Sequence, residues 1–109
     1  MTTYILTQGA VNAARAEVGD QVEVHLIEDS AAGLRWEVTD LPGCLSPAEP
    51  TGRRPEASAG SFLRIIGFDA HADGSGELVL SLHRDDQPPL RTVRWRVEVR
   101  RRRRPVTQS

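Results

Sequence analysis

The sequence predicts an all-β domain, an antiparallel β-sandwich or barrel, on three observations. Short runs of residues alternate between apolar and polar side chains with a period of two, which is typical of half-buried strands. Gly, Pro and Asp separate these runs, and no segment shows the period of an amphipathic helix. The 109 residues suffice for one domain with a modest core, which must consist mainly of Val, Leu and Ile because aromatic residues make up only 5% of the chain.

Two alternating runs lie close together between Asp20 and Thr39, and we expect them to form a hairpin. Residues 28–33 join the runs as a loop, in which Gly33 can adopt a positive φ at little cost. We expect Trp36 to fill the core and the loop to carry binding chemistry, because exposed loops on a rigid sheet usually do. The apolar face of the pair consists of Val22, Val24, Leu26, Leu34, Trp36 and Val38.

The other elements are less regular. Tyr4–Thr7 is predicted as an edge strand, whereas residues 9–17 are alanine-rich and ambiguous. Residues 42–60 hold four prolines and three glycines and are predicted as a long loop. Residues 61–70 form a strand whose irregularity at 65–67 indicates a bulge or a strand covered on both faces. The last two strands, 77–83 and 92–100, follow a turn at 73–76 and enclose a polar loop.

Charge is distributed unevenly along the chain. Residues 1–99 carry nine arginines against fifteen carboxylates, whereas the remaining basic residues are Arg100, Arg101, Arg102, Arg103 and Arg104. We therefore divide the chain into an acidic domain, 1–99, and an arginine-rich tail, 100–109. The tail is either an anion-binding arm with an acidic partner or a solvated charge run that keeps an edge strand from pairing. The acidic body makes specific nucleic-acid binding an unfavoured function.

The sequence lacks the residue patterns of an enzyme or a metal site. Cys44 has no neighbouring histidine that could activate it, and we expect it to be an exposed or half-buried structural residue. His25, His71 and His83 are scattered without ligand spacing, and we expect His25 to be solvated on an outward strand face. We predict a binding protein with neither a metal nor a cofactor.

The cellular location is predicted from features that are absent from the sequence. A single cysteine cannot form an internal disulfide, so no oxidising compartment is required. The first residues lack the pattern of a secretion signal, and no segment approaches the roughly 20 apolar residues of a membrane span. We therefore expect a soluble, cytoplasmic protein.

The order of elements resembles the chagasin family of cysteine-peptidase inhibitors over about Val18 to Val99. The resemblance implies an immunoglobulin-like antiparallel β-sandwich of about seven strands. It also implies inhibition of papain-like cysteine peptidases by three loops that enter the substrate cleft from one pole. The residues that carry it are Val18-Gly19-Asp20, Gly33-Leu34-Arg35-Trp36, Asp40-Leu41, Gly43, Phe68 and Asp73-Gly74.

The three loops depart from the family's motifs. The first, Asp29-Ser30-Ala31-Ala32-Gly33, keeps only the glycine of Asn-Pro-Thr-Thr-Gly. The second, Ser58-Ala59-Gly60-Ser61, keeps one glycine of Gly-x-Gly-Gly, and the third, Arg84-Asp85-Asp86, keeps the arginine but replaces a proline and an aromatic residue. The resemblance implies that the partner-binding residues are Asp29, Ser30, Ala31, Ala32, Gly33, Ala59, Gly60, Arg84, Asp85 and Asp86.

Two functions follow from these residues. The leading hypothesis is an inhibitor of papain-like cysteine peptidases. Its target cleft would be electropositive, because Glu28, Asp29, Asp85 and Asp86 would share one pole. The alternative is a non-inhibitory adaptor or assembly subunit that binds partners through the acidic loops and the arginine tail.

Overall fold

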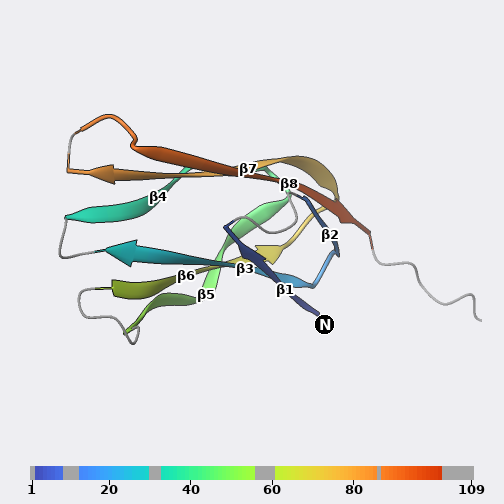
Figure 1. The fold of residues 1–109 in the computed structure, drawn as a ribbon. Helices are drawn as coiled ribbons and strands as arrows, with labels where there is room; N and C mark the ends of the chain where they lie inside the picture. The colour runs from blue at the N-terminus through green and yellow to red at the C-terminus, as the bar shows by residue number, and fades with distance from the viewer. Residues whose placement is uncertain (1, 9–12, 30–32, 56–60, 86, 102–109) are drawn as a thin grey trace, which may run out of the picture.

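The computed structural model describes residues 2–8, 13–29, 33–55, 61–85 and 87–101, which form an immunoglobulin-like β-sandwich. The all-β prediction is therefore confirmed, with eight strands in place of about seven. Two four-stranded sheets, in the orders β1-β3-β6-β5 and β2-β8-β7-β4, face each other (Figure 1). The described part of the chain contains no helix that is long and apolar enough to span a membrane. The strands are β1 (Thr3–Thr7), β2 (Ala13–Glu17), β3 (Gln21–Asp29), β4 (Leu34–Asp40), β5 (Leu45–Pro55), β6 (Ser61–Ala70), β7 (Gly74–Arg84) and β8 (Arg91–Arg100).

The first two strands lie in different sheets. β1 is an edge strand, as predicted, and runs parallel to β3, whereas β2 runs parallel to β8 in the opposite sheet. The backbone N–H of Gln21 donates to the Thr2 carbonyl at 2.9 Å, and that of Val18 donates to the Arg100 carbonyl at 2.8 Å. Residues 9–17, which were ambiguous in sequence, thus contain β2. The strand pairs of the sandwich are antiparallel except for β1 with β3 and β2 with β8.

The predicted hairpin between Asp20 and Thr39 is wrong in its pairing. Both strands exist, but β3 pairs with β1 and β6, whereas β4 pairs with β7 in the other sheet. A period of two shows that one face of a strand is buried, and it does not identify the neighbouring strand. Here the two apolar faces meet across the core, and Trp36 Nε1 donates to the Ile27 carbonyl at 2.9 Å.

The prediction of a loop throughout residues 42–60 is also wrong, because β5 occupies most of it. β5 is an edge strand, where proline is tolerated since one side of the backbone needs no donor. Its register shifts between Ala48 and Gly52, opposite residues 65–67 of β6. The register shift lies in β5, whereas the consecutive buried residues 65–68 show that β6 is covered on both faces, which is the second of the two predicted alternatives.

The core fills the space between the sheets. Trp36 is 2% exposed, as predicted, and Trp95 is buried in the same cluster. Cys44 is 4% exposed, so the expectation of an exposed or half-buried thiol is wrong, and burial raises the pKa of that thiol. His25 is likewise less solvated than expected, because its Nε2 lies 2.9 Å from Glu23 Oε1 and its side chain is only 20% exposed.

Candidate functional site

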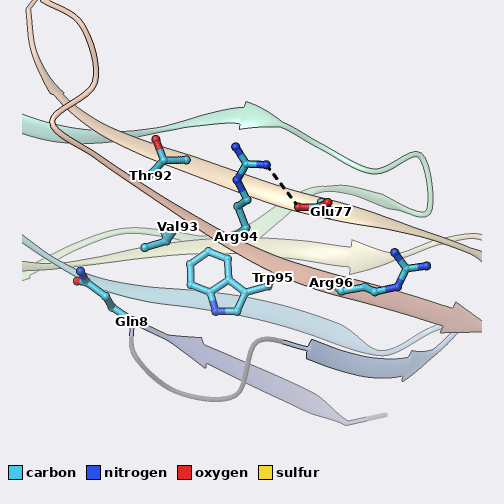
Figure 2. A pocket seen from close by; sticks show the side chains of 7 residues that line it. All are labelled: Gln8, Glu77, Thr92, Val93, Arg94, Trp95 and Arg96. Carbon is cyan, nitrogen blue, oxygen red and sulfur yellow. Dashed lines mark ion pairs between the residues drawn. The ribbon is translucent and has the colours of Figure 1, made fainter.

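A hollow of about 490 Å³ lies along β8 on the side of the sandwich (Figure 2). Arg94 and Glu77 form an ion pair of 3.9 Å at its rim, and Trp95 lies beneath it in the core. It lacks a histidine, cysteine or paired carboxylate that could perform acid–base or nucleophilic chemistry among its described lining residues. Within the described ranges, no three His, Cys, Asp or Glu residues gather in a way that could hold a metal ion. The residues that line the hollow are Gln8, Glu77, Thr92, Val93, Arg94, Trp95 and Arg96.

The candidate binding site lies at the end of the sandwich where β3, β5 and β7 end and β4, β6 and β8 begin (Figure 1). The strand ends that flank them are paired: Leu34 with Arg84 in one sheet, and Asp29 with Ser61 and Pro55 with Phe62 in the other. We call this end the loop pole, represented by residues 33–34, 84–85 and 87–90. Its position is set by the sheets, so the loops start from a rigid frame.

Gly33 and Arg84 are neighbours at the loop pole, because Leu34 pairs with Arg84. Gly33 has a φ of 74°, a backbone conformation that favours glycine. A Cβ atom at this position would lie 3.7 Å from Cγ of Arg84, which is ordinary van der Waals contact. The last residue of the first loop therefore lies next to the first residue of the third, with room for a Cβ atom between them.

The third loop is held by its own backbone. The N–H of Gln87 donates to the Arg84 carbonyl at 2.8 Å and closes a four-residue turn. Asp85 has a φ of 44°, a conformation that Asp tolerates better than most residues. The N–H of Leu90 then donates to the Leu82 carbonyl at 2.8 Å and returns the chain to the sheet. These bonds fix the loop before any partner arrives.

An apolar tip follows this turn. Pro88, Pro89 and Leu90 are exposed, with Leu90 at 65%, and together with Arg84 and Gln87 they line a hollow of about 590 Å³. The sequence interpretation treated this segment as part of a polar loop and overlooked it. The sequence feature that could have indicated this apolar tip is Leu90, an apolar residue that follows two prolines just before the last strand.

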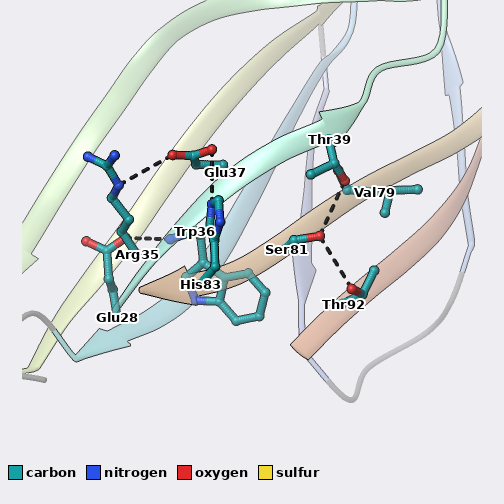
Figure 3. A network of polar contacts seen from close by, with 9 residues as sticks. All are labelled: Glu28, Arg35, Trp36, Glu37, Thr39, Val79, Ser81, His83 and Thr92. Atoms are coloured by element: carbon teal, nitrogen blue, oxygen red, sulfur yellow. Dashed lines mark hydrogen bonds and ion pairs between the residues drawn. The ribbon is translucent and has the colours of Figure 1, made fainter. Parts of the chain in front are cut away.

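Glu28 does not belong to the surface of the loop pole, and its assignment to an acidic tip is wrong. It is fully buried, and its Oε2 accepts a hydrogen bond of 3.0 Å from the backbone N–H of Trp36 (Figure 3). The reason is alternation, because Glu28 lies on the same face of β3 as Val24 and Leu26, which point into the core. Asp85 is exposed and remains in the candidate site.

A polar cluster on the outer face of β4 and β7 adjoins the loop pole (Figure 3). Glu37 lies 3.4 Å from Arg35 Nε and 3.0 Å from His83 Nε2. Because His83 directly precedes Arg84, this cluster holds the strand from which the third loop begins. Farther along, hydroxyl groups of Thr39, Ser81 and Thr92 form a row across three strands. Basic and acidic side chains therefore lie side by side next to the loop pole.

Part of the predicted site cannot be placed. Ser30, Ala31, Ala32, Ala59, Gly60 and Asp86 lie outside the described residues, as do Arg102, Arg103 and Arg104. Asp29 is described only through its backbone pairing with Ser61. Of the predicted partner-binding residues, the structure thus brings together Gly33, Arg84 and Asp85.

The described part of the arginine tail lies at the opposite end of the sandwich. Arg100 is the last residue of β8, and its Nε donates to Glu98 Oε1 at 2.9 Å. This hydrogen bond and the charge of Arg100 lower the pKa of Glu98. A hollow of about 520 Å³ nearby is lined by Tyr4, Arg15, Ala16, Glu17, Arg100 and Arg101.

Comparison with known proteins identifies solved structures that share this fold. No family model and no curated protein sequence matches the chain. Among solved structures, it is similar to the cysteine protease inhibitor EhICP2 from Entamoeba histolytica, with a TM-score of 0.78 and 19% identity over 91% of this chain and 96% of that one. The chain shares the fold of this solved structure. The chagasin-like fold predicted from the sequence is thereby confirmed.

Two further solved structures agree. The solution structure of amebosin matches with a TM-score of 0.64 and 21% identity, over 93% of this chain and 97% of that one. PbICP-C, solved in complex with falcipain-2, matches with a TM-score of 0.59 and 14% identity, over 91% of this chain and 99% of that one. The similarity covers nearly the full length of each structure, so the architecture is shared as a whole.

Proposed function

We propose that this protein inhibits papain-like cysteine peptidases by inserting its loop pole into the substrate cleft. The observation that carries the proposal is that Gly33 and Arg84 are neighbours at the loop pole. These are the residues that the first and third loops share with the chagasin-family motifs. The fold brings them together at one pole of a sandwich that is similar to a cysteine protease inhibitor and to a protein solved in complex with falcipain-2.

The loop pole can act as a preformed wedge. The turn that begins at Arg84 is closed by backbone hydrogen bonds, and the two prolines that follow restrict the chain further. A loop that is already ordered loses little conformational entropy on binding, which favours affinity. Inhibition by occupation of the cleft needs no bond of the inhibitor to be cleaved.

The energy of binding would come from the tip of the third loop. Leu90 and the adjoining prolines offer apolar surface on the third loop, in which Asp86 replaces the aromatic residue of the family motif. Apolar anchors near the centre of an interface often dominate its energy. Since Glu28 is buried, the proposal no longer requires an electropositive cleft, and we expect a cleft with an apolar wall opposite Leu90.

Titration against a papain-like peptidase with a fluorogenic substrate tests the function. We expect competitive inhibition with one inhibitor bound per enzyme. The variant Arg84→Ala should weaken inhibition. Arg94→Ala is the matched control, because Arg94 is also an exposed arginine, with a side chain 66% exposed, but lies along the side of the sandwich. Absence of inhibition by the unmodified protein at micromolar concentration would refute the proposal.

A second candidate function is that of an adaptor whose arginine-rich end binds an acidic protein segment. It is favoured by the exposure of Arg100 and Arg101 beside Arg15 and the hollow that they line. Binding of polyglutamate to the full chain, measured by calorimetry at two salt concentrations, tests it. We expect affinity to fall with salt and on changing Arg100 and Arg101 to Gln, whereas Arg94→Gln should have little effect. Equal binding by all of these variants would refute it.

A cytoplasmic location stays a prediction. It rests on the single cysteine, which cannot form an internal disulfide. Cell fractionation of the expressed protein tests it, and recovery in a secreted or membrane fraction would contradict it.

A further inference from the structure

We propose that β1 is a dimerisation edge, which pairs antiparallel with β1 of a second copy of this chain. The proposal does not depend on peptidase inhibition. It begins from an edge strand, Thr3–Thr7, whose outer side pairs with no strand of the described part of the chain. An open edge of this kind is a template for pairing with another chain.

The backbone groups of β1 face outward in the required pattern. Because Gln21 N–H donates to the Thr2 carbonyl, alternation turns the N–H and C=O groups of Thr3, Ile5 and Thr7 away from β3. A two-fold axis through Ile5 would place it opposite Ile5 of the partner subunit, and Thr3 opposite Thr7 of the partner subunit. Each such pair exchanges two hydrogen bonds in an antiparallel ladder, so about six would form.

The other three sheet edges carry features that discourage pairing. β5 contains Pro47, Pro50 and Pro55, which lack backbone donors. β4 carries charged residues and a register shift between Val38 and Asp40, and β2 carries Arg15 and Glu17. Proline, bulges and charge are usual protections of edge strands.

β1 differs from these edges in its composition. Residues 2–8 include neither a charged residue nor a proline, in a chain that is 27% charged. Ile5 is 55% exposed on the outer face, where Ile27 of the neighbouring strand is 53% exposed. A second copy is the fitting occupant, because an uncharged strand opposes itself without charge repulsion and an isologous pair closes at two subunits.

Pairing would join the two β1-containing sheets into one continuous sheet of eight strands. Since the paired strands are antiparallel, the loop poles of the two copies would point in opposite directions. Both would stay accessible to a partner. The interface is small, so we expect a weak dimer whose population depends on concentration.

Sedimentation equilibrium across the micromolar to low-millimolar range tests the proposal. We expect the average mass to rise from the 12.0 kDa of the monomer towards twice that value. Ile5→Lys should raise the dissociation constant at least about tenfold, because it places like charges opposite each other. Ile27→Lys is the matched control, since Ile27 is equally exposed on the same face but lies in β3, which is paired along both edges. Thermal unfolding verifies that both variants remain folded.

Oxidative cross-linking adds a readout of the register. In a hydrogen-bonded antiparallel pair the Cα atoms lie about 5.5 Å apart, within the range that a disulfide spans. Ile5→Cys should therefore give a covalent dimer, and Ile27→Cys should not, while Cys44 is buried and does not interfere. A protein that is monomeric at all concentrations would overturn the proposal. A dimer would also overturn the proposal if Ile5→Lys left it intact and Ile5→Cys formed no covalent cross-link.

Discussion

The backbone N–H of Trp36 donates to the buried carboxylate of Glu28 over 3.0 Å, and this bond joins the two sheets. Glu28 belongs to β3 and Trp36 to β4. These strands lie in different sheets, β3 before the first loop and β4 after it. The Trp36 indole adds a second bond to the carbonyl of Ile27. The two bonds together fix the base of the first loop.

Replacing Glu28 should destabilise the fold. Glu28→Ala leaves a buried backbone donor without this acceptor, which costs about 1–3 kcal/mol. Glu28→Gln keeps an acceptor oxygen and should cost less. Urea unfolding measures both, with Glu77→Ala as the control because the side chain of Glu77 is 49% exposed. An equal effect of Glu28→Ala and Glu77→Ala would contradict a structural role for the Glu28 carboxylate.

Replacing Gly33 should affect both stability and inhibition. In Gly33→Ala the new Cβ meets Arg84 at an ordinary contact distance, so the cost arises from the φ of 74°. A left-handed conformation costs a residue with a Cβ about 1–2 kcal/mol. We expect that loss in chemical denaturation and a weaker inhibition constant, because relief of the strain would displace Arg84.

Gly43→Ala is the matched control for this variant. Gly43 is exposed, its φ is not positive, and a Cβ there would meet nothing within 4 Å. If Gly33→Ala is as stable and as inhibitory as Gly43→Ala, the positive φ of Gly33 does not have the predicted role.

Replacing Leu90 should affect inhibition without affecting stability. Leu90→Ser removes apolar surface that is 65% exposed, so we expect the free energy of unfolding to change by no more than about 0.5 kcal/mol. If Leu90 contacts the peptidase, the inhibition constant should rise about tenfold, which corresponds to ~1.4 kcal/mol. Ile5→Ser serves as the control, because Ile5 is 55% exposed but pairs with Glu23, six residues before the end of β3 at the loop pole. Equal inhibition constants for both variants would exclude Leu90 from the interface.

The thiol of Cys44 should react slowly in the folded protein. Burial raises its pKa, and a higher pKa leaves less of the reactive thiolate at neutral pH. Raising the pH should therefore accelerate alkylation only above the range usual for an exposed cysteine. Mass spectrometry after iodoacetamide treatment, with and without denaturant, measures the rate. Modification at the same rate in both conditions would show that the thiol is accessible.

The strands with regular alternation could be predicted from sequence, but their partners could not. The alternation in β8 and β3 identified both strands and their buried faces correctly. Pairing depends on contacts between residues distant in sequence, which periodicity does not encode, so β3 and β4 were assigned to one hairpin. β5 was overlooked because its prolines resemble those of a loop, although an edge strand accommodates them.

The candidate site was predictable to a similar extent. Gly33 and Arg84 could be named from the family resemblance, and the fold places them next to each other. Glu28 was misplaced because the charge of its side chain was given more weight than its position on the buried face of β3. Leu90 was missed because exposure is a property of the folded loop, where a hydrogen bond to Leu82 holds the backbone while the side chain points outward.

The parallel pairing of β1 with β3 determines how the molecule can be attached to a surface. Thr2 lies beside Gln21, at the start of β3, and Arg101 follows the end of β8. The eight residue steps from Gln21 to Asp29 span about 26 Å, so both the first and the last described residues lie far from the loop pole. Immobilised through either end, the protein would display its loops towards solution in the same orientation. Biosensor chips or fusion partners can thus be coupled at whichever terminus is convenient.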